Sequence, residues 1–141
     1  MSGFEQAGEL FDRYIVAGNH GASDYFALIK ELVRRKNTEG DGWQEHIDRA
    51  YAVLYQEMCE NQGDPTEPVT FGTSGWRGRL GKDIFVRSVA IVTAAIVELY
   101  ATLETDSSLA SLLGVMSYDE ARRRGCVVGF DNRFAVESHA A

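Results

Sequence analysis

The feature that most constrains this chain is the segment 61–68, which interrupts the helical pattern and contains both prolines of the chain, Pro65 and Pro68. Proline removes a backbone donor and disfavours helix at the residue before it. The break also separates two kinds of sequence pattern, helical before it and mixed after it. We therefore expect two parts: a helical N-terminal extension, residues 1–64, and an α/β part, residues 65–141.

Apolar spacing in the first part predicts helices. Ser23 is a suitable N-cap for a helix that places Phe26, Ile29, Leu32 and Val33 on one side. Asp41 with Gln44 three residues later resembles a capping box for the next helix. The residues expected to be buried along that helix are Trp43, Ile47, Ala50, Tyr51, Leu54, Tyr55 and Met58. The pattern predicts an antiparallel helical hairpin with a third, short helix in front of it.

Directly after the break, residues 71–78 read Phe-Gly-Thr-Ser-Gly-Trp-Arg-Gly. Glycines such as Gly75 let a backbone approach a ligand closely, and the hydroxyls of Thr73 and Ser74 donate and accept hydrogen bonds. Arg77 carries a planar fork of donors that matches a phosphate group. These residues predict the wall of a site for an anionic, phosphate-bearing ligand. The alternative is a structural loop in which Thr73 and Ser74 bond the local backbone.

The rest of the second part predicts strands alternating with helices. We expect short strands at residues 69–71 and 79–80, helices at 86–103 and 118–124, a strand at 126–130 and a helix starting near residue 136. The helix at 86–103 is apolar around nearly its whole circumference and should be covered on more than one side. Arg87 and Glu98 interrupt it, so we interpret it as a buried helix that does not span a membrane. Ser117 should cap the helix at 118–124. The strand at 126–130 is continuously apolar, which suits a parallel strand buried on both faces.

Charge, cysteine content and the N-terminal sequence argue against a nucleic-acid-binding protein, a metal site and a signal peptide. The net charge of −7 argues against a nucleic-acid partner, which would need a basic face. Cys59 and Cys126 stand in no metal-ligand spacing, and the three histidines form no ligand cluster, so we expect no metal site. The N-terminus lacks the basic and apolar regions of a signal peptide. These observations favour a cytoplasmic protein without a membrane partner.

A second motif occurs near the end of the chain, where residues 127–133 read Val-Val-Gly-Phe-Asp-Asn-Arg. It is an apolar strand followed by a polar turn that carries Asp131 and Arg133. With residues 72–78 and the long helix between the motifs, it resembles the start of an α-D-phosphohexomutase, the family of phosphoglucomutases and phosphomannomutases. The resemblance covers the chain from about Val69 onward.

The resemblance implies a fold and an activity. Members of the family have four α/β domains around one cleft, and the first is a three-layer α/β/α unit. A phosphoserine in that domain exchanges its phosphoryl group with a hexose phosphate through a bisphosphate, assisted by Mg²⁺ held by the second domain. By analogy, Thr73, Ser74, Gly75 and a catalytic Arg77 would lie beside the phosphoserine, with Asp131 and Arg133 at its border.

The sequence departs from the family in what it lacks. It has no Thr-Ala-Ser-His-Asn-Pro-like serine loop and no metal loop, and the neighbours of Ser74 are wrong for the phosphoserine. We therefore expect an incomplete first domain, truncated before that loop, which binds no metal, is inactive alone and is prone to self-association. Two alternatives stay open: a non-catalytic module that binds phosphate or a phosphosugar, and an interaction module that docks a partner through its N-terminal helices, with the α/β part as scaffold.

Overall fold

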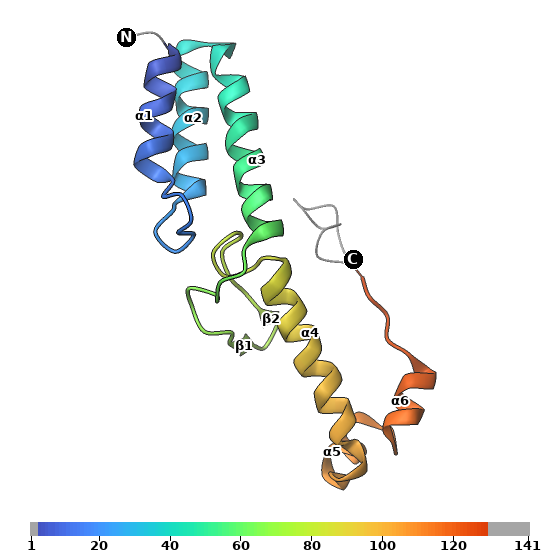
Figure 1. Ribbon diagram of the computed structural model, residues 1–141. Helices are drawn as coiled ribbons and strands as arrows, with labels where there is room; N and C mark the ends of the chain where they lie inside the picture. Colours follow the sequence, from blue (N-terminus) through green and yellow to red (C-terminus); the bar gives the residue numbers. More distant parts are fainter. Residues whose placement is uncertain (1–2, 130–141) are drawn as a thin grey trace. The chain divides into compact units, whose positions relative to one another are not determined.

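The computed structural model of the chain describes residues 3–129 (Figure 1). These residues are mostly helical and include one small two-stranded sheet, in agreement with a mixed α/β class. The chain forms two compact units, Met1–Arg87 and Ser88–Ala141. The expected division between residues 64 and 65 falls inside the first unit and stays a prediction about domain organisation.

Three helices lie side by side in the first unit: α1 (Gly3–Tyr14), α2 (Tyr25–Glu39) and α3 (Gln44–Glu60) (Figure 1). A 3₁₀ turn, η1 (Asp41–Trp43), leads into α3. Their shared core consists of Ala7, Leu10, Phe11, Tyr25, Leu28, Ile29, Leu32, Trp43, Ile47, Ala50, Leu54 and Met58. The predicted helical hairpin with a third helix in front is confirmed.

Two of the predicted helix caps are wrong. Asp24 is the N-cap of α2, where its carboxylate accepts a hydrogen bond from the Ala27 amide at 3.0 Å. Ser23 is fully buried, and its hydroxyl donates to the Asn19 carbonyl oxygen at 2.9 Å. The predicted capping box does not form, because η1 precedes α3 and no side chain caps its first turn. The hydroxyl of Ser23 thus bonds the turn between α1 and α2, and the cap of α2 falls to its neighbour Asp24.

The predicted core of the helices was also too wide. Phe26, Val33, Tyr51 and Tyr55 are exposed, although the sequence placed them on buried faces. On α3 the buried residues recur at the spacing of a single stripe, from Ile47 to Met58. Tyr51 and Tyr55 lie on the flank of that stripe, because the neighbouring helices cover only one side of α3.

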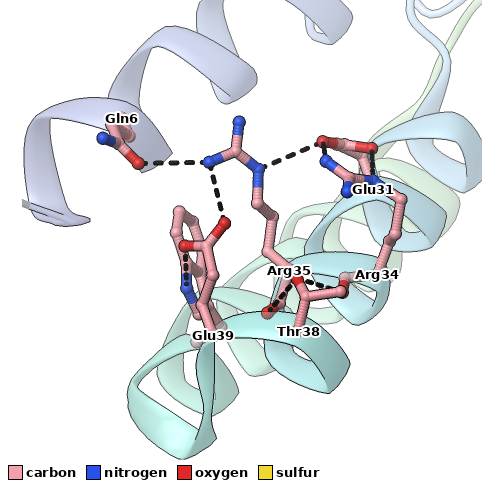
Figure 2. Close-up of polar contacts among 7 residues, drawn as sticks. Gln6, Glu31, Arg34, Arg35, Thr38 and Glu39 are labelled. Atoms are coloured by element: carbon pink, nitrogen blue, oxygen red, sulfur yellow. Dashed lines mark hydrogen bonds and ion pairs between the residues drawn. The ribbon is translucent and has the colours of Figure 1, made fainter.

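A polar network on α2 joins α1, α2 and η1 (Figure 2). The Arg35 guanidinium donates to Glu31 Oε1 at 3.2 Å, to Gln6 Oε1 of α1 at 3.1 Å and to Glu39 Oε1 at 3.2 Å. Glu39 Oε2 accepts from the indole Nε1 of Trp43 at 3.0 Å. The network therefore ties α1 to α2 and seats the buried tryptophan of η1.

The sheet is a short hairpin of β1 (Phe71–Gly72) and β2 (Gly75–Trp76). The strand expected at 69–71 starts two residues later than predicted. The second strand lies at 75–76 and not at 79–80, where the chain makes only an isolated bridge between Leu80 and Ile84. The hairpin forms earlier because a two-residue turn pairs its strands locally.

The second part of the chain continues with helices. These are α4 (Val86–Ala101), the 3₁₀ turn η2 (Thr102–Glu104), α5 (Ser107–Leu113) and α6 (Tyr118–Arg124). Ser117 caps α6 as predicted, since its hydroxyl accepts from the Glu120 amide at 3.1 Å. Leu103, Ala110 and Val115 form a small core beneath η2 and α5.

The prediction of a buried parallel strand at 126–130 is wrong for residues 126–129, the part of it that the structure describes. These residues form no strand, and Val127 is 99% exposed. A strand needs a partner with a free edge, and no described segment pairs with this one. Phe130 and the helix expected near residue 136 lie outside the described residues.

The expectation that the long helix is buried is also wrong for the described chain. Ser88 is the only buried residue of α4, and Ile91, Ile96, Val97 and Leu99 are about half exposed. By length and composition alone, residues 86–104 also meet the requirements for a membrane-spanning helix. The absence of a membrane partner therefore stays a prediction.

Candidate functional site

The predicted phosphate-binding residues lie on the hairpin of the first unit. Thr73 and Ser74 form its two-residue turn, between the pairs Phe71–Trp76 and Gly72–Gly75. Both hydroxyl-bearing residues are exposed. Gly75 belongs to β2, with φ +106°, and is half-buried. The structure thus presents two hydroxyl groups at the tip of one short hairpin.

Arg77 follows the hairpin and turns back toward its tip. Its Nη2 donates a hydrogen bond to the Ser74 hydroxyl oxygen at 2.8 Å. The residue is exposed, and no carboxylate in residues 3–129 pairs with its guanidinium. Four of the five N–H donors of Arg77 therefore have no protein partner in this part of the chain. An arginine in this state can donate two parallel hydrogen bonds to an anion.

The local interaction of the turn differs from that of a purely structural loop. In such a loop, Thr73 and Ser74 would bond their own backbone. Here Ser74 bonds the Arg77 side chain, and the described residues give Thr73 no side-chain hydrogen bond. The structure therefore brings Ser74 and Arg77 together next to Thr73. Asp131 and Arg133, the other two predicted site residues, lie outside the described residues.

A buried carboxylate holds the base of this loop, and the sequence patterns did not single it out. The Asp83 side chain is 4% exposed and accepts four hydrogen bonds. One oxygen accepts from the Thr66 hydroxyl at 2.5 Å and the Glu67 amide at 3.1 Å. The other accepts from the Arg79 amide at 2.9 Å and its Nε at 3.2 Å. Asp83 therefore joins the chain before the hairpin to the chain after it.

These contacts change the acidity of Asp83. Burial by itself raises the pKa of a carboxyl group, but the hydrogen bonds from Thr66, Arg79 and Glu67 outweigh burial here. Together they lower the pKa of Asp83 from 3.8 to about 2. The carboxylate is thus ionised at neutral pH. The available sequence signal was weak: Asp83 stands directly before the apolar pair Ile84–Phe85, and an acid that is buried with such residues needs hydrogen-bond partners.

The base of the loop rests on the helices of the same unit. A side chain added at Gly81 would place its Cβ 2.8 Å from Leu54 Cδ1 and 3.4 Å from the Tyr25 ring, so any larger residue would have to displace Leu54. Gly81 also has φ +78°, a conformation that other residues rarely adopt. Burial is the main reason that the pKa of the adjacent Tyr25 is raised to about 12. The N-terminal helices therefore form the surface on which the loop is seated.

The described residues do not fit a magnesium site. No group of three or more His, Cys, Asp or Glu side chains in residues 3–129 is placed to hold a metal ion. Asp83 is the most buried carboxylate near the loop, and its four hydrogen bonds already occupy both oxygens. Thr73, Ser74 and Arg77 offer hydrogen bonds and one positive charge to a ligand at this loop.

Comparisons of the chain with family models, with curated proteins and with solved structures found no match.

Proposed function

We propose that this chain supplies the leading part of the first domain of an α-D-phosphohexomutase, and that its hairpin loop binds the phosphate of a hexose phosphate. In the complete enzyme, Arg77 would stabilise charge on the phosphoryl group that moves between serine and sugar. Thr73, Ser74 and Gly75 would line the same pocket, with Asp131 and Arg133 at its edge.

The observation that carries the proposal is the state of Arg77. Its guanidinium is exposed, bonds the neighbouring Ser74 hydroxyl and pairs with no carboxylate in the described part of the chain. Most other arginines of the first unit bond or stack on partners: Arg34 and Arg35 on Glu31, Arg79 on Asp83, and Arg49 over the Phe11 ring. In a chain with net charge −7, an unpaired arginine beside two hydroxyl groups is suited to an anionic ligand.

The test is a titration of the ¹⁵N-labelled chain with glucose 1-phosphate, followed by ¹H–¹⁵N NMR. We expect saturable shifts at the amides of Thr73 and Ser74 and at Nε–H of Arg77. Affinity should be weak, in the millimolar range, because one arginine and two hydroxyls bury little of the ligand. The variant Arg77→Ala should lose the shifts, and Arg77→Lys should keep a weaker response, since lysine lacks the fork of donors.

Arg34→Ala is the matched control. It removes the same charge from an exposed arginine that is bound to Glu31. Arg34 lies nine residues beyond Tyr25 on α2, about 13 Å along the helix axis. Its response to glucose 1-phosphate should equal that of the unmodified chain. If the unmodified chain shows no shift at Thr73, Ser74 or Arg77, the proposed binding site is wrong.

We further propose that this chain alone binds phosphate without transferring it. Ser74 has no general base among its partners, only the cationic Arg77. The Mg²⁺ of the family enzyme would be held by residues outside this chain, and the hexose phosphate would be the substrate of the complete protein. The chain should therefore leave glucose 1-phosphate unchanged, and measurable formation of glucose 6-phosphate would contradict this.

The three-layer α/β/α domain is part of the same proposal. The exposed apolar surface of α4 and the unpaired Val127 and Val128 support it, because helices and strands of such a domain cover one another. The same exposed surface supports self-association of this chain. The alternative, an interaction module in a cytoplasmic protein, would dock a partner through its N-terminal helices, where Phe26, Tyr51 and Tyr55 are exposed, and would bind no phosphosugar.

A further inference from the structure

We propose that Asp83 is the positioning residue of the phosphate-binding loop, because its carboxylate holds the two ends of that loop together. This inference rests on the proposed function of the hairpin. It assigns no contact with the ligand to Asp83, which acts through the backbone that carries Thr73, Ser74 and Arg77.

The two oxygens of Asp83 serve different arms of the loop. Oδ1 binds the arm that enters it, through the Thr66 hydroxyl and the Glu67 amide. Oδ2 binds the arm that leaves it, through the amide and Nε of Arg79. Residues 68–78, which contain the whole hairpin, lie between these anchor points. One carboxylate therefore closes the loop at its neck.

Additional contacts make this neck a defined structure. Arg79 Nη2 donates to the Thr66 hydroxyl oxygen at 3.1 Å, which links the two arms directly. The Thr66 amide donates to the Lys82 carbonyl oxygen at 3.1 Å. A Cβ added at Gly78 would lie 2.6 Å from Asp83 Cβ, so the leaving arm passes directly over the aspartate. Arg77 is the residue before this point of contact.

A neutral amide cannot replace the carboxylate at this position. All four groups that face Asp83 are donors, and an asparagine offers one acceptor oxygen and one donor NH₂. Asp83→Asn can therefore hold one arm, while its NH₂ group faces the donors of the other. A buried donor left without a partner is strongly unfavourable, so the neck should open.

The sign of the effect on phosphate binding separates positioning from simple electrostatics. Removing a negative charge near an anion site should strengthen binding if charge alone mattered. If Asp83 positions the loop, Asp83→Asn should weaken binding although the chain becomes less negative. The change of net charge cannot explain weaker binding, because a less negative chain attracts phosphate more strongly.

The experiment compares Asp83→Asn with the unmodified chain in two measurements. Inorganic phosphate is titrated against each ¹⁵N-labelled protein, and amide hydrogen exchange is recorded without ligand. We expect about tenfold weaker phosphate binding, and a larger increase in exchange at the amides of Glu67 and Arg79 than in α1–α3. Equal or tighter binding by Asp83→Asn, or unchanged exchange at the neck, would overturn the inference.

Matched variants separate the hydrogen bonds of the neck from its charge. Asp64→Asn makes the same change of charge at an exposed residue close to the neck in sequence, and should bind phosphate as well as or slightly better than the unmodified chain. Thr66→Val removes one donor to Asp83, and should weaken phosphate binding less than Asp83→Asn does. Thr66→Ser keeps the hydroxyl and should restore the phosphate binding that Thr66→Val loses. Failure of Thr66→Ser to restore binding would count against the neck as the cause.

The two proposals fail in different ways. If the unmodified chain does not bind phosphate or glucose 1-phosphate, the proposed function is wrong, and the exchange data alone decide whether Asp83 holds the loop closed. If the unmodified chain binds and Asp83→Asn binds equally well, the function stands and the role of Asp83 is wrong.

Discussion

Helices α3 and α4 have nearly the same length, 17 and 16 residues, and opposite environments. On α3 the apolar residues form one stripe, and its members Ile47, Ala50, Leu54 and Met58 are buried. On α4 apolar residues occupy almost the whole circumference, and only Ser88 is buried. The pattern of α3 requires contact on one face of the helix, and that of α4 requires contact on several faces. Within the described chain, only the apolar residues of α3 are covered in this way.

The difference teaches how to interpret an apolar helix from its sequence. A single stripe is satisfied by one neighbouring layer, which α1 and α2 provide inside the first unit. An apolar circumference needs cover on several sides, and residues 3–129 cover α4 only in part: Ser88 is buried, and Tyr100 packs against the small core of Leu103, Ala110 and Val115. The composition of α4 thus predicts the need for a partner surface and does not identify it.

The largest expected effect tests this comparison with two leucines. Leu54→Ala, at a fully buried position of α3, should lower the free energy of unfolding by about 3 kcal/mol. Leu99→Ala, at a half-exposed position of α4, should lower it by less than about 1 kcal/mol, since the side chain leaves little cavity. Urea unfolding followed by circular dichroism measures both. Equal losses would mean that α4 is covered in solution.

The next effect is the pH dependence that Asp83 gives to the first unit. Its pKa is lowered from 3.8 to about 2 on folding, so the folded state binds fewer protons than the unfolded state in this range. The stabilisation is therefore complete above about pH 4 and is lost as the pH falls toward about 2. It amounts to about 2 kcal/mol.

The measurement compares the unmodified chain with Asp83→Asn by urea unfolding at several pH values. The difference in unfolding free energy should be largest near neutral pH and should shrink between about pH 4 and about pH 2. The pKa of Glu31, lowered to about 2 by its hydrogen bonds with Arg34 and Arg35, affects both proteins equally. A difference that does not change with pH would show that the charge of Asp83 is not the cause.

A smaller effect concerns the helix caps of the two units. Asp24→Ala removes the N-cap of α2 and should lower the unfolding free energy by about 1 kcal/mol. Asp106→Ala removes the carboxylate that accepts from the amides of Ser108 and Leu109 at the start of α5. It should increase amide exchange in α5 and leave that of α1–α3 unchanged. Faster exchange in α1–α3 would show that the two units unfold together.

The smallest expected effect on stability comes from charges placed on α4. Ile96→Lys with Val97→Glu, at two half-exposed positions, should change the unfolding free energy by less than about 0.5 kcal/mol. The same pair should reduce self-association, measured by sedimentation velocity, because it interrupts the apolar surface. A large loss of stability, or a monomeric unmodified chain, would contradict the assignment of α4 as an uncovered helix.

Much of the local structure could be predicted from short-range patterns. The stripe from Ile47 to Met58 predicted α3, and Ser117 was correctly expected to cap α6. The composition of residues 71–78 predicted a glycine-rich turn, and the hairpin turn of Thr73 and Ser74 lies there. These features depend on residues within one or two turns of one another, which sequence spacing describes well.

Other features depended on contacts between distant residues. The burial of Asp83 was settled by its hydrogen bonds to Thr66 and Glu67, 17 and 16 residues away. The strand expected at 126–130 depended on a partner edge that no described residue offers. No local pattern contains either kind of information, because both depend on which segments meet.

The sequence by itself determined the helices of the first unit, the glycine-rich turn and the apolar character of α4, since periodicity and backbone preference act over a few residues. Only the tertiary structure decided that Gly81 is seated against Leu54 and that Asp83 closes the loop. Asp83 and Thr66 are 17 residues apart, and their hydrogen bond exists only after the chain has folded back on itself. A buried carboxylate is stable there because four donors surround it, and that enclosure is a property of the fold.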